Sequence, residues 1–201
     1  MRVVIVGVAA RAFQWDEADE PWMVNRAPVM YPLLPRQYLG RARWFHLHGP
    51  EHILAAEGPL QIENLKAAAA EGTYRVYMPK AYYPGVIPFP YDKVIADTQA
   101  HVQKLHSSGE AYSVDRGLFG VHHLHNSFPL LIAFAILEGA THIVMDGVQF
   151  GPDKPAEQWA VPAIEWQLGR AAGKGIKVSV PLGSGLMEPR HIYGLEGPGC
   201  V

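Results

Sequence analysis

Two histidines at the end of a predicted strand are well suited to acid–base chemistry. Residues 43–48 (RWFHLH) read as a strand, and alternation along it places His46 and His48 on the same face. Gly49 and Pro50 end the strand, so His48 lies at its carboxyl end. An imidazole titrates near neutral pH, which suits a general base. Two such histidines can also bind a metal, but the strand itself carries no carboxylate or cysteine, and we expect no metal site.

A second group of polar residues flanks an apolar unit at residues 125–149. Ser127 is placed to cap a helix that is almost wholly apolar from residue 130 to residue 137. Residues 142–145 then read as a buried strand, and polar residues follow at its carboxyl end, where open parallel sheets bind ligands. The candidates from this unit are His125 as a second base, with Asn126, Ser127, Asp146, Gly147 and Gln149 as binding residues.

Other predicted strand ends add candidates for binding a nucleotide or substrate. The first strand ends in a glycine turn, and Arg11 in the loop after it can reach a phosphate. An asparagine closes the second strand, and a serine follows the last one. A solvated Arg11 and a turn-forming Asn25 are the structural alternatives, and both stay open. The candidates are Gly7, Arg11, Asn25, Arg26 and Ser184.

The order of the predicted strands and helices that position these residues indicates an α/β fold. It is expected to be a Rossmann-like three-layer sandwich with a mostly parallel sheet of about six strands. Crossovers on either side of the first strand would create a switch point near Gly7. The 79–90 stretch (PKAYYPGVIPFP) is too rich in proline for regular structure. The expected strands are 3–7, 22–25, 43–48, 73–78, 142–145 and 176–180, and the expected helices are 59–71, 91–106, 127–137 and 156–172, with Pro162 bending the last helix or marking its start.

Length and composition suit one domain over residues 1–201, with the Pro-rich loop at 79–90 and a loosely ordered tail at 194–201. The chain is 49% hydrophobic and 18% charged, and its net charge of −2 gives no indication of nucleic-acid binding. The lone Cys200 rules out an internal disulfide framework. No signal-peptide layout and no membrane-spanning apolar run are present, so we expect a cytoplasmic protein.

Several catalytic classes lack their motifs. No P-loop is present, which argues against ATP hydrolysis of that type. The segment 182–186 (LGSGL) does not match the Gly-x-Ser-x-Gly elbow of α/β-hydrolases, so a hydrolase triad is not expected. Only one glycine of the dinucleotide fingerprint follows the first strand.

Taken together, the motifs VVIVG, WMVN, RWFHLH, RVYMP, HNS–helix–EGATHIVMDGVQ and GKGIKVSVPLGSGL resemble a group of small phage-encoded Rossmann-like proteins. That group is distantly similar to bacterial sialyltransferases and to motility-accessory-factor and hydroxymethylpterin-pyrophosphokinase-like proteins. The resemblance covers roughly residues 3–187 and rests on the order and spacing of short motifs.

The resemblance implies a nucleotide lying over the glycine turn from Gly7 to Arg11, and contacts from Asn25 to the nucleotide-sugar region. It also implies that residues 125–127 face the donor and that residues 146–149 read the nucleoside. The chain departs from the family pattern in two places. Gln149 stands where relatives carry an acid, and the Gly-Asn-Gly-Pro-Ser first loop of the relatives is absent.

We therefore expect a glycosyltransferase-like enzyme that uses a nucleotide sugar as substrate and requires no metal or other cofactor. Its acceptor would be a modified base, a nucleotide or a glycan. Two alternatives stay open: a non-catalytic protein that sequesters or senses a nucleotide, and a nucleotide-cleaving or pyrophosphokinase-like enzyme on the same scaffold. Nucleic acid as acceptor and a homo-oligomer are also left open. If the protein is encoded by a bacteriophage, its place is the cytoplasm of the host cell.

Overall fold

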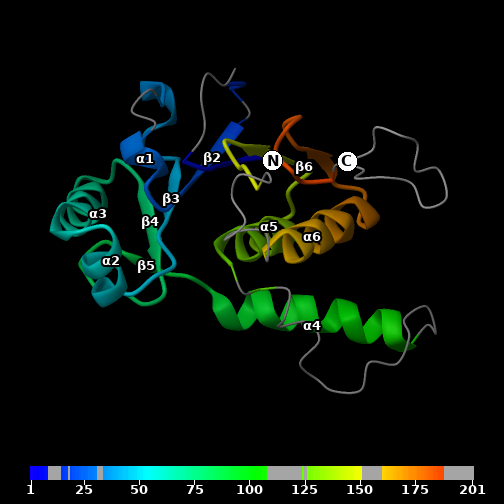
Figure 1. The fold of residues 1–201 in the computed structure, drawn as a ribbon. Helices are drawn as coiled ribbons and strands as arrows, with labels where there is room; N and C mark the ends of the chain where they lie inside the picture. Colours follow the sequence, from blue (N-terminus) through cyan, green and yellow to red (C-terminus); the bar gives the residue numbers. More distant parts are fainter. Residues whose placement is uncertain are drawn as a thin grey trace, which may run out of the picture.

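The fold is an α/β sandwich around a parallel sheet. The computed structural model describes residues 1–8, 15–17, 19–30, 34–107, 124, 126–150 and 160–187, with backbone only for Met30 and 102–107. Within these residues seven strands form one parallel sheet in the order β5-β4-β3-β2-β1-β6-β7 (Figure 1). The strands are β1 (Arg2–Val6), β2 (Asp19–Val24), β3 (Arg43–Phe45), β4 (Arg75–Met78), β5 (Ile87–Pro88), β6 (His142–Asp146) and β7 (Lys177–Ser179).

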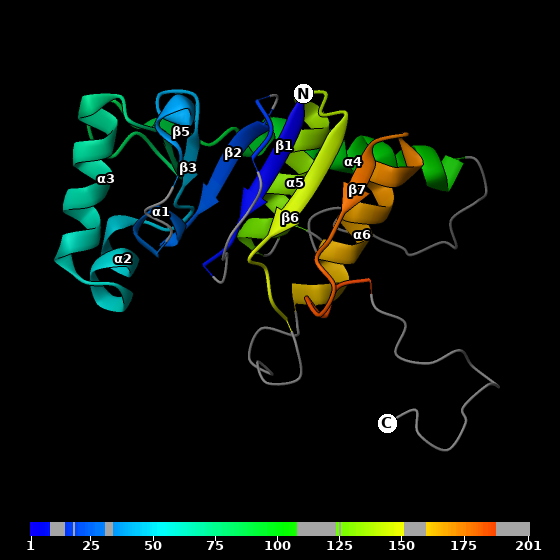
Figure 2. The same cartoon turned by 90° about the horizontal axis from the view of Figure 1, so that it is seen from above.

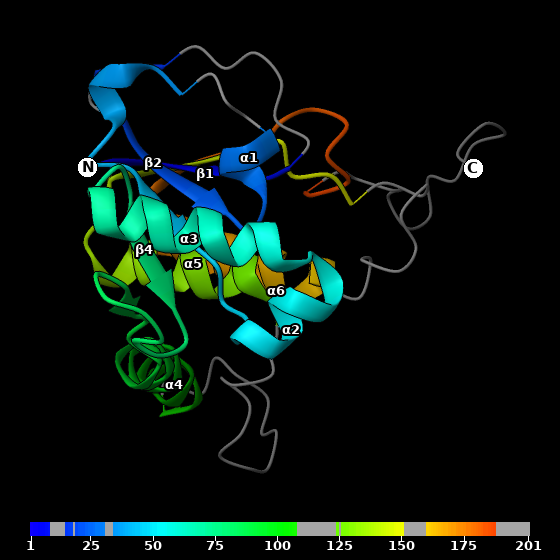
Figure 3. The same cartoon turned by 90° about the vertical axis from the view of Figure 1, so that its left-hand side faces the viewer.

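Helices cover the sheet on both faces, as the Rossmann-like prediction requires. α2 and α3 lie on one side of the sheet, and α5 and α6 lie on the other, with α4 running across them (Figures 1 and 3). The helices are α1 (Ala27–Met30), α2 (Pro50–Ala56), α3 (Pro59–Glu71), α4 (Tyr91–Ser107), α5 (Ser127–Leu137) and α6 (Val161–Gly173), together with a 3₁₀ turn at Arg36–Tyr38.

Each central strand buries side chains on both faces. Val3 and Ile5 of β1 belong to the core under α5 and α6, whereas Val4 and Val6 join the core that contains Leu65 of α3. A strand covered on both faces needs a continuous apolar run, which is why the run in β1 predicts a central parallel strand correctly. The near-complete burial of residues 129–136 in α5 likewise confirms the predicted all-round apolar helix.

The seventh strand corrects the prediction that the 79–90 stretch has no regular structure. β5 is a two-residue edge strand whose Ile87 and Pro88 pair with β4. The backbone N–H of Phe89 donates to the carbonyl of Met78 at 2.8 Å. An edge strand bonds to one neighbour only, so a proline without an N–H is tolerated there.

Other boundaries move for tertiary reasons. β2 begins at Asp19, three residues before the expected start at residue 22, because Asp19 pairs in register with Arg2 of β1. β3 ends at Phe45 rather than at His48, and the sequence reading missed α2 altogether. α3 has the predicted bounds. Pro162 lies at the start of α6, which confirms one of the two alternatives predicted for this proline.

Paired charges close the amino edge of the sheet. Arg43 is 5% exposed, and its guanidinium pairs with Glu20 and, at 2.6 Å, with Glu138. It also lies 4.9 Å from the centroid of the Trp22 ring. Arg75 shares Glu20 with it at 3.0 Å. These residues join β2, β3, β4 and the end of α5, so the network fixes how the strands start relative to one another.

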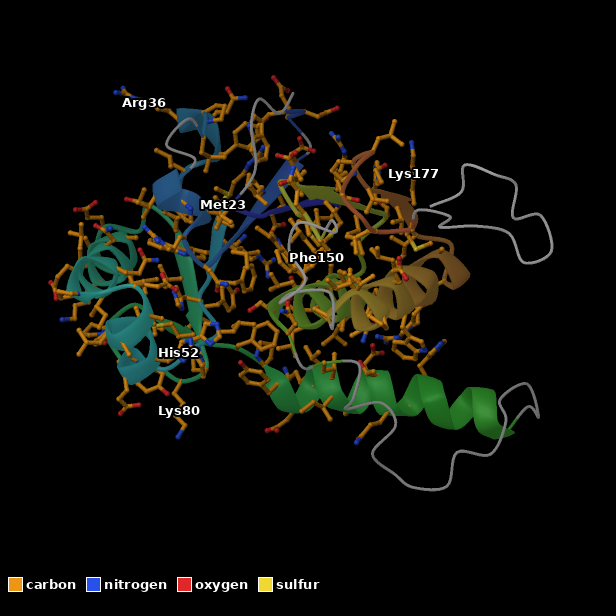
Figure 4. The ribbon with its side chains drawn as sticks, viewed as in Figure 1. Met23, Arg36, His52, Lys80, Phe150 and Lys177 are labelled. Carbon is orange, nitrogen blue, oxygen red and sulfur yellow. The ribbon has the colours of Figure 1, made fainter. Side chains whose placement is uncertain are left out.

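Replacing Arg43 tests this network. Arg43→Ala leaves the partly buried Glu138 without its cation and Glu20 with Arg75 alone, and we expect a loss of about 3–5 kcal/mol in the free energy of unfolding, measured by urea denaturation. Arg36→Ala is the matched control, because Arg36 is exposed and extends outward in Figure 4, and should change stability by less than about 0.5 kcal/mol. Equal effects of the two substitutions would refute the structural role of the network.

Candidate functional site

The chain changes direction at the carboxyl ends of β1 and β6. From β1 the chain moves to β2 and on toward β5, whereas from β6 it moves to β7 on the opposite side. Figure 2 shows these strands running in one direction, with their carboxyl ends toward the lower part of the view. Ligands of open α/β sheets bind at such a switch point. The topology thus puts the switch point at Gly7, as the sequence predicts.

Gly7 is required by the packing of β1 against the end of β6. Its N–H donates to the carbonyl of Asp146 at 2.7 Å. A Cβ built on Gly7 would lie 2.4 Å from the carbonyl oxygen of Gly147. Gly147 itself has a φ of 63°, in the left-handed region that glycine tolerates. The two glycines therefore let two strand ends touch without side chains between them.

Asp146 presents a desolvated carboxyl group at the switch point. Its Oδ2 is buried and has no hydrogen-bond partner in the described part of the chain. Burial raises the pKa of Asp146, and a hydrogen bond from the Gly147 backbone opposes that rise. A buried acceptor without a donor is costly, so the folded chain gains if a ligand donates to Asp146.

Asn25 is held rigidly beside this point, at the end of β2. Its backbone has a φ of 50°, and its N–H donates to the carbonyl of Phe45 at 2.9 Å. Its own carbonyl accepts from Trp44 Nε1 at 2.6 Å and from Gln61 Nε2 at 3.4 Å. The Asn25 Oδ1 is buried, and none of the residues that the structure describes donates a hydrogen bond to it. Arg26, the next residue, is exposed.

The start of α5 corrects the predicted helix cap. Asn126, not Ser127, is the cap, and its Oδ1 accepts from the N–H of Phe128 at 3.0 Å. The extended backbone of Asn126 places its side chain over the first turn, whereas Ser127 is already helical. The Phe128 ring contacts the Phe150 ring at 5.8 Å between centroids. The start of α5 and the segment after β6, which both carry predicted site residues, therefore lie side by side.

Ser184 and Gln149 differ in burial and in their hydrogen bonds. Ser184 is buried, its Oγ accepts from the N–H of Leu186 at 3.2 Å, and its carbonyl accepts from the N–H of Phe150 at 2.7 Å. Ser184 therefore ties the turn after β7 to the segment after β6. Gln149 is exposed at that segment.

Histidines gather at the carboxyl end of β3. The rings of His46 and His48 lie 5.7 Å apart, and His48 stacks on His52 at 4.3 Å. His46 Nε2 lies 3.1 Å from Glu57 Oε1. Burial lowers the pKa of both His46 and His48, so both are neutral at pH 7. Sequence reasoning missed His52 and Glu57, although His52 stands four residues after His48 and one turn into α2.

The candidate residues form two neighbouring groups on one edge. We call Gly7, Asn25, Asp146, Gly147 and the start of α5 the switch-point group. His46, His48, His52 and Glu57 form the histidine group. β3 is two strand positions from β1, about 10 Å, and three from β6, about 14 Å. Arg11 and His125 lie outside the described residues.

The described part of the chain holds no set of three histidine, cysteine or acidic residues arranged to bind a metal ion. Nor does any helix in that part combine the length and apolar character needed to cross a bilayer. Searches against protein-family models, curated proteins and solved structures find no match.

Substituting two glycines tests the contact between β1 and β6. Gly7→Ala puts a methyl group onto a backbone carbonyl, and we expect a loss of about 1–3 kcal/mol or more in unfolding free energy. Gly169→Ala in α6 meets nothing within 4 Å and should instead stabilise the protein by about 0.5–1 kcal/mol. If both substitutions shift the urea midpoint in the same direction, the contact is not the constraint described.

Asp146→Asn tests the desolvated carboxyl. A raised folded pKa contributes stability that is present below the unfolded pKa and is lost as pH rises through the folded pKa. At neutral pH the variant should therefore melt at a higher temperature than the wild type, and the gap should shrink as pH falls. Asp92→Asn, at an exposed position in α4, should show no such trend. A lower melting temperature for Asp146→Asn at neutral pH would contradict the assignment.

Proposed function

We propose that the protein binds a nucleotide sugar along the carboxyl edge of its sheet and acts as a glycosyltransferase-like enzyme. One observation carries the proposal: four buried side-chain acceptor atoms along this edge have no hydrogen-bond partner among the described residues. They are Asn25 Oδ1, His46 Nδ1, Glu57 Oε2 and Asp146 Oδ2. Such atoms are costly in a folded protein and favour a ligand rich in hydroxyl or N–H donors. Nucleosides and sugars are ligands of this kind.

The switch-point group suits the nucleotide part. Asp146 can accept from a ribose hydroxyl or a base N–H. The N-terminus of α5 favours the negative charge of a phosphate, although Asn126 already occupies the Phe128 N–H. Arg26, exposed at the end of β2, is available to a phosphate oxygen.

The histidine group suits the acceptor. In the proposed reaction the acceptor hydroxyl gives its proton to an imidazole nitrogen of His48, and its oxygen forms a bond to the anomeric carbon. The bond from that carbon to the phosphate oxygen breaks, and the nucleotide leaves with the electron pair. A neutral His48 supports this step because only the unprotonated nitrogen can accept the proton.

A nucleotide-binding protein without transfer activity is the second candidate. The separation of about 10 Å between β3 and β1 favours it, because binding at the switch point does not require the histidine group. Turnover separates the two candidates.

A ligand panel tests the proposal. Free nucleotides and CMP-, UDP- and GDP-sugars are screened by thermal shift, and chromatography follows their conversion. One of them, at 100 times its Kd, should stabilise the protein by about 2.7 kcal/mol, a melting shift of several degrees. Asp146→Ala should remove the shift, whereas His48→Gln should keep it and lose product formation.

His142→Gln, at the amino end of β6, and Asp92→Ala are the controls and should keep both the shift and the product. Binding without product would favour the second candidate. If no member of the panel shifts the melting temperature, both candidates fail.

A further inference from the structure

Glu57 and His46 form a buried pair beneath the exposed part of the histidine group. His46 is fully buried, and the Glu57 side chain is 13% exposed. Glu57 follows directly after α2, and His46 follows β3, where its N–H bonds to the Tyr77 carbonyl at 2.9 Å. Both side chains are thus fixed by their backbones before any ligand arrives.

The contact between the two side chains sets the tautomer of His46. A carboxylate only accepts hydrogen bonds, so His46 Nε2, 3.1 Å from Glu57 Oε1, must carry the hydrogen. In the neutral ring the buried Nδ1 is then an acceptor, and it has no partner. The carboxylate also supplies a negative charge close to the imidazole rings.

His48 and His52 occupy the outer part of the group. Their rings are stacked with an interplanar angle of 23°, and His52 is exposed on α2 (Figure 4). Two stacked imidazoles cannot both be protonated without repulsion. From the neighbouring loop, Tyr82 Oη reaches 3.3 Å from where a Gly49 Cβ would lie. Glu51 is exposed next to His52 on α2, and Lys80, which is exposed in the loop after β4, extends outward in Figure 4.

We propose that Glu57 and His46 are positioning residues that make the histidine group a single proton-accepting unit, with His48 as its contact to an acceptor hydroxyl. The substrate class, a hydroxyl-bearing acceptor, rests on the proposed function, but the coupling within the unit does not. When His48 takes the acceptor proton, the Glu57 carboxylate behind His46 stabilises the new positive charge. His52 opposes a second proton, and the exposed side of the stack releases the first to solvent.

Histidine NMR titration tests the unit without any ligand. In the wild type, nitrogen chemical shifts should show His46 protonated at Nε2, and His48 should titrate below the value of an exposed histidine. Glu57→Gln should move the midpoints of His46 and His48 to lower pH, because the carboxylate raises the pKa of both. His52→Gln should move the midpoint of His48 to higher pH, because a like charge is removed.

Glu51→Gln is the matched control. It removes the same charge from an exposed position on α2 and should leave both midpoints unchanged. Circular dichroism checks that each variant is folded. If Glu57→Gln does not fold, the midpoint of His48 in His52→Gln still tests the coupling. Unchanged midpoints in folded Glu57→Gln, or His46 protonated at Nδ1, would overturn the proposal.

The titration and the ligand panel test the two proposals separately, so either proposal can be refuted while the other stands. Loss of coupling would remove the positioning role while nucleotide binding at the switch-point group stands. A panel without any binding would remove the proposed function while the coupled titration stands.

Discussion

The close contact between the ends of β1 and β6 is the constraint on which the rest of the molecule depends. β1 pairs with β2 on one side and β6 on the other, and the chain leaves the two strand ends in opposite directions. Gly7 and Gly147 let the backbones touch there, since a single Cβ on Gly7 would collide with a carbonyl. That contact leaves Asp146 half-buried beside it, with an oxygen that has no donor among the described residues.

The two edges of the sheet are built in opposite ways. At the amino edge, charges from three strands and from the end of α5 pair with one another, with Arg43 enclosed by carboxylates and aromatic rings. At the carboxyl edge, acceptor atoms on Asn25, His46 and Asp146 are buried without partners. Satisfied polar groups stabilise a fold, whereas unsatisfied ones lower its stability and persist where a ligand completes them. The paired charges of this network and the unpartnered acceptors of the candidate site thus lie at opposite ends of the strands.

Much of the fold follows from local patterns. The apolar run of β1, the all-round apolar character of α5 and the glycine after it, and the bounds of α3 are readable from the residues themselves. Errors arise where long-range pairing overrides local signals. Ile87 and Pro88 form a strand because β4 offers them an open edge, and Asp19 extends β2 because Arg2 pairs with it. The cap of α5 depends on the backbone angles of Asn126, which residue type alone leaves open between Asn126 and Ser127.

For the candidate site, the sequence by itself determined which residues end the strands, because side-chain periodicity and glycine turns are local properties. It therefore identified Gly7, Asn25, His48 and Asp146 as residues of one sheet edge. Only the tertiary structure decided the strand order, which separates His48 from Asp146 by two intervening strands. It also brought Glu57 to His46 and His52 onto His48. Pairing order and side-chain contact depend on how distant segments pack, and no local pattern encodes that packing.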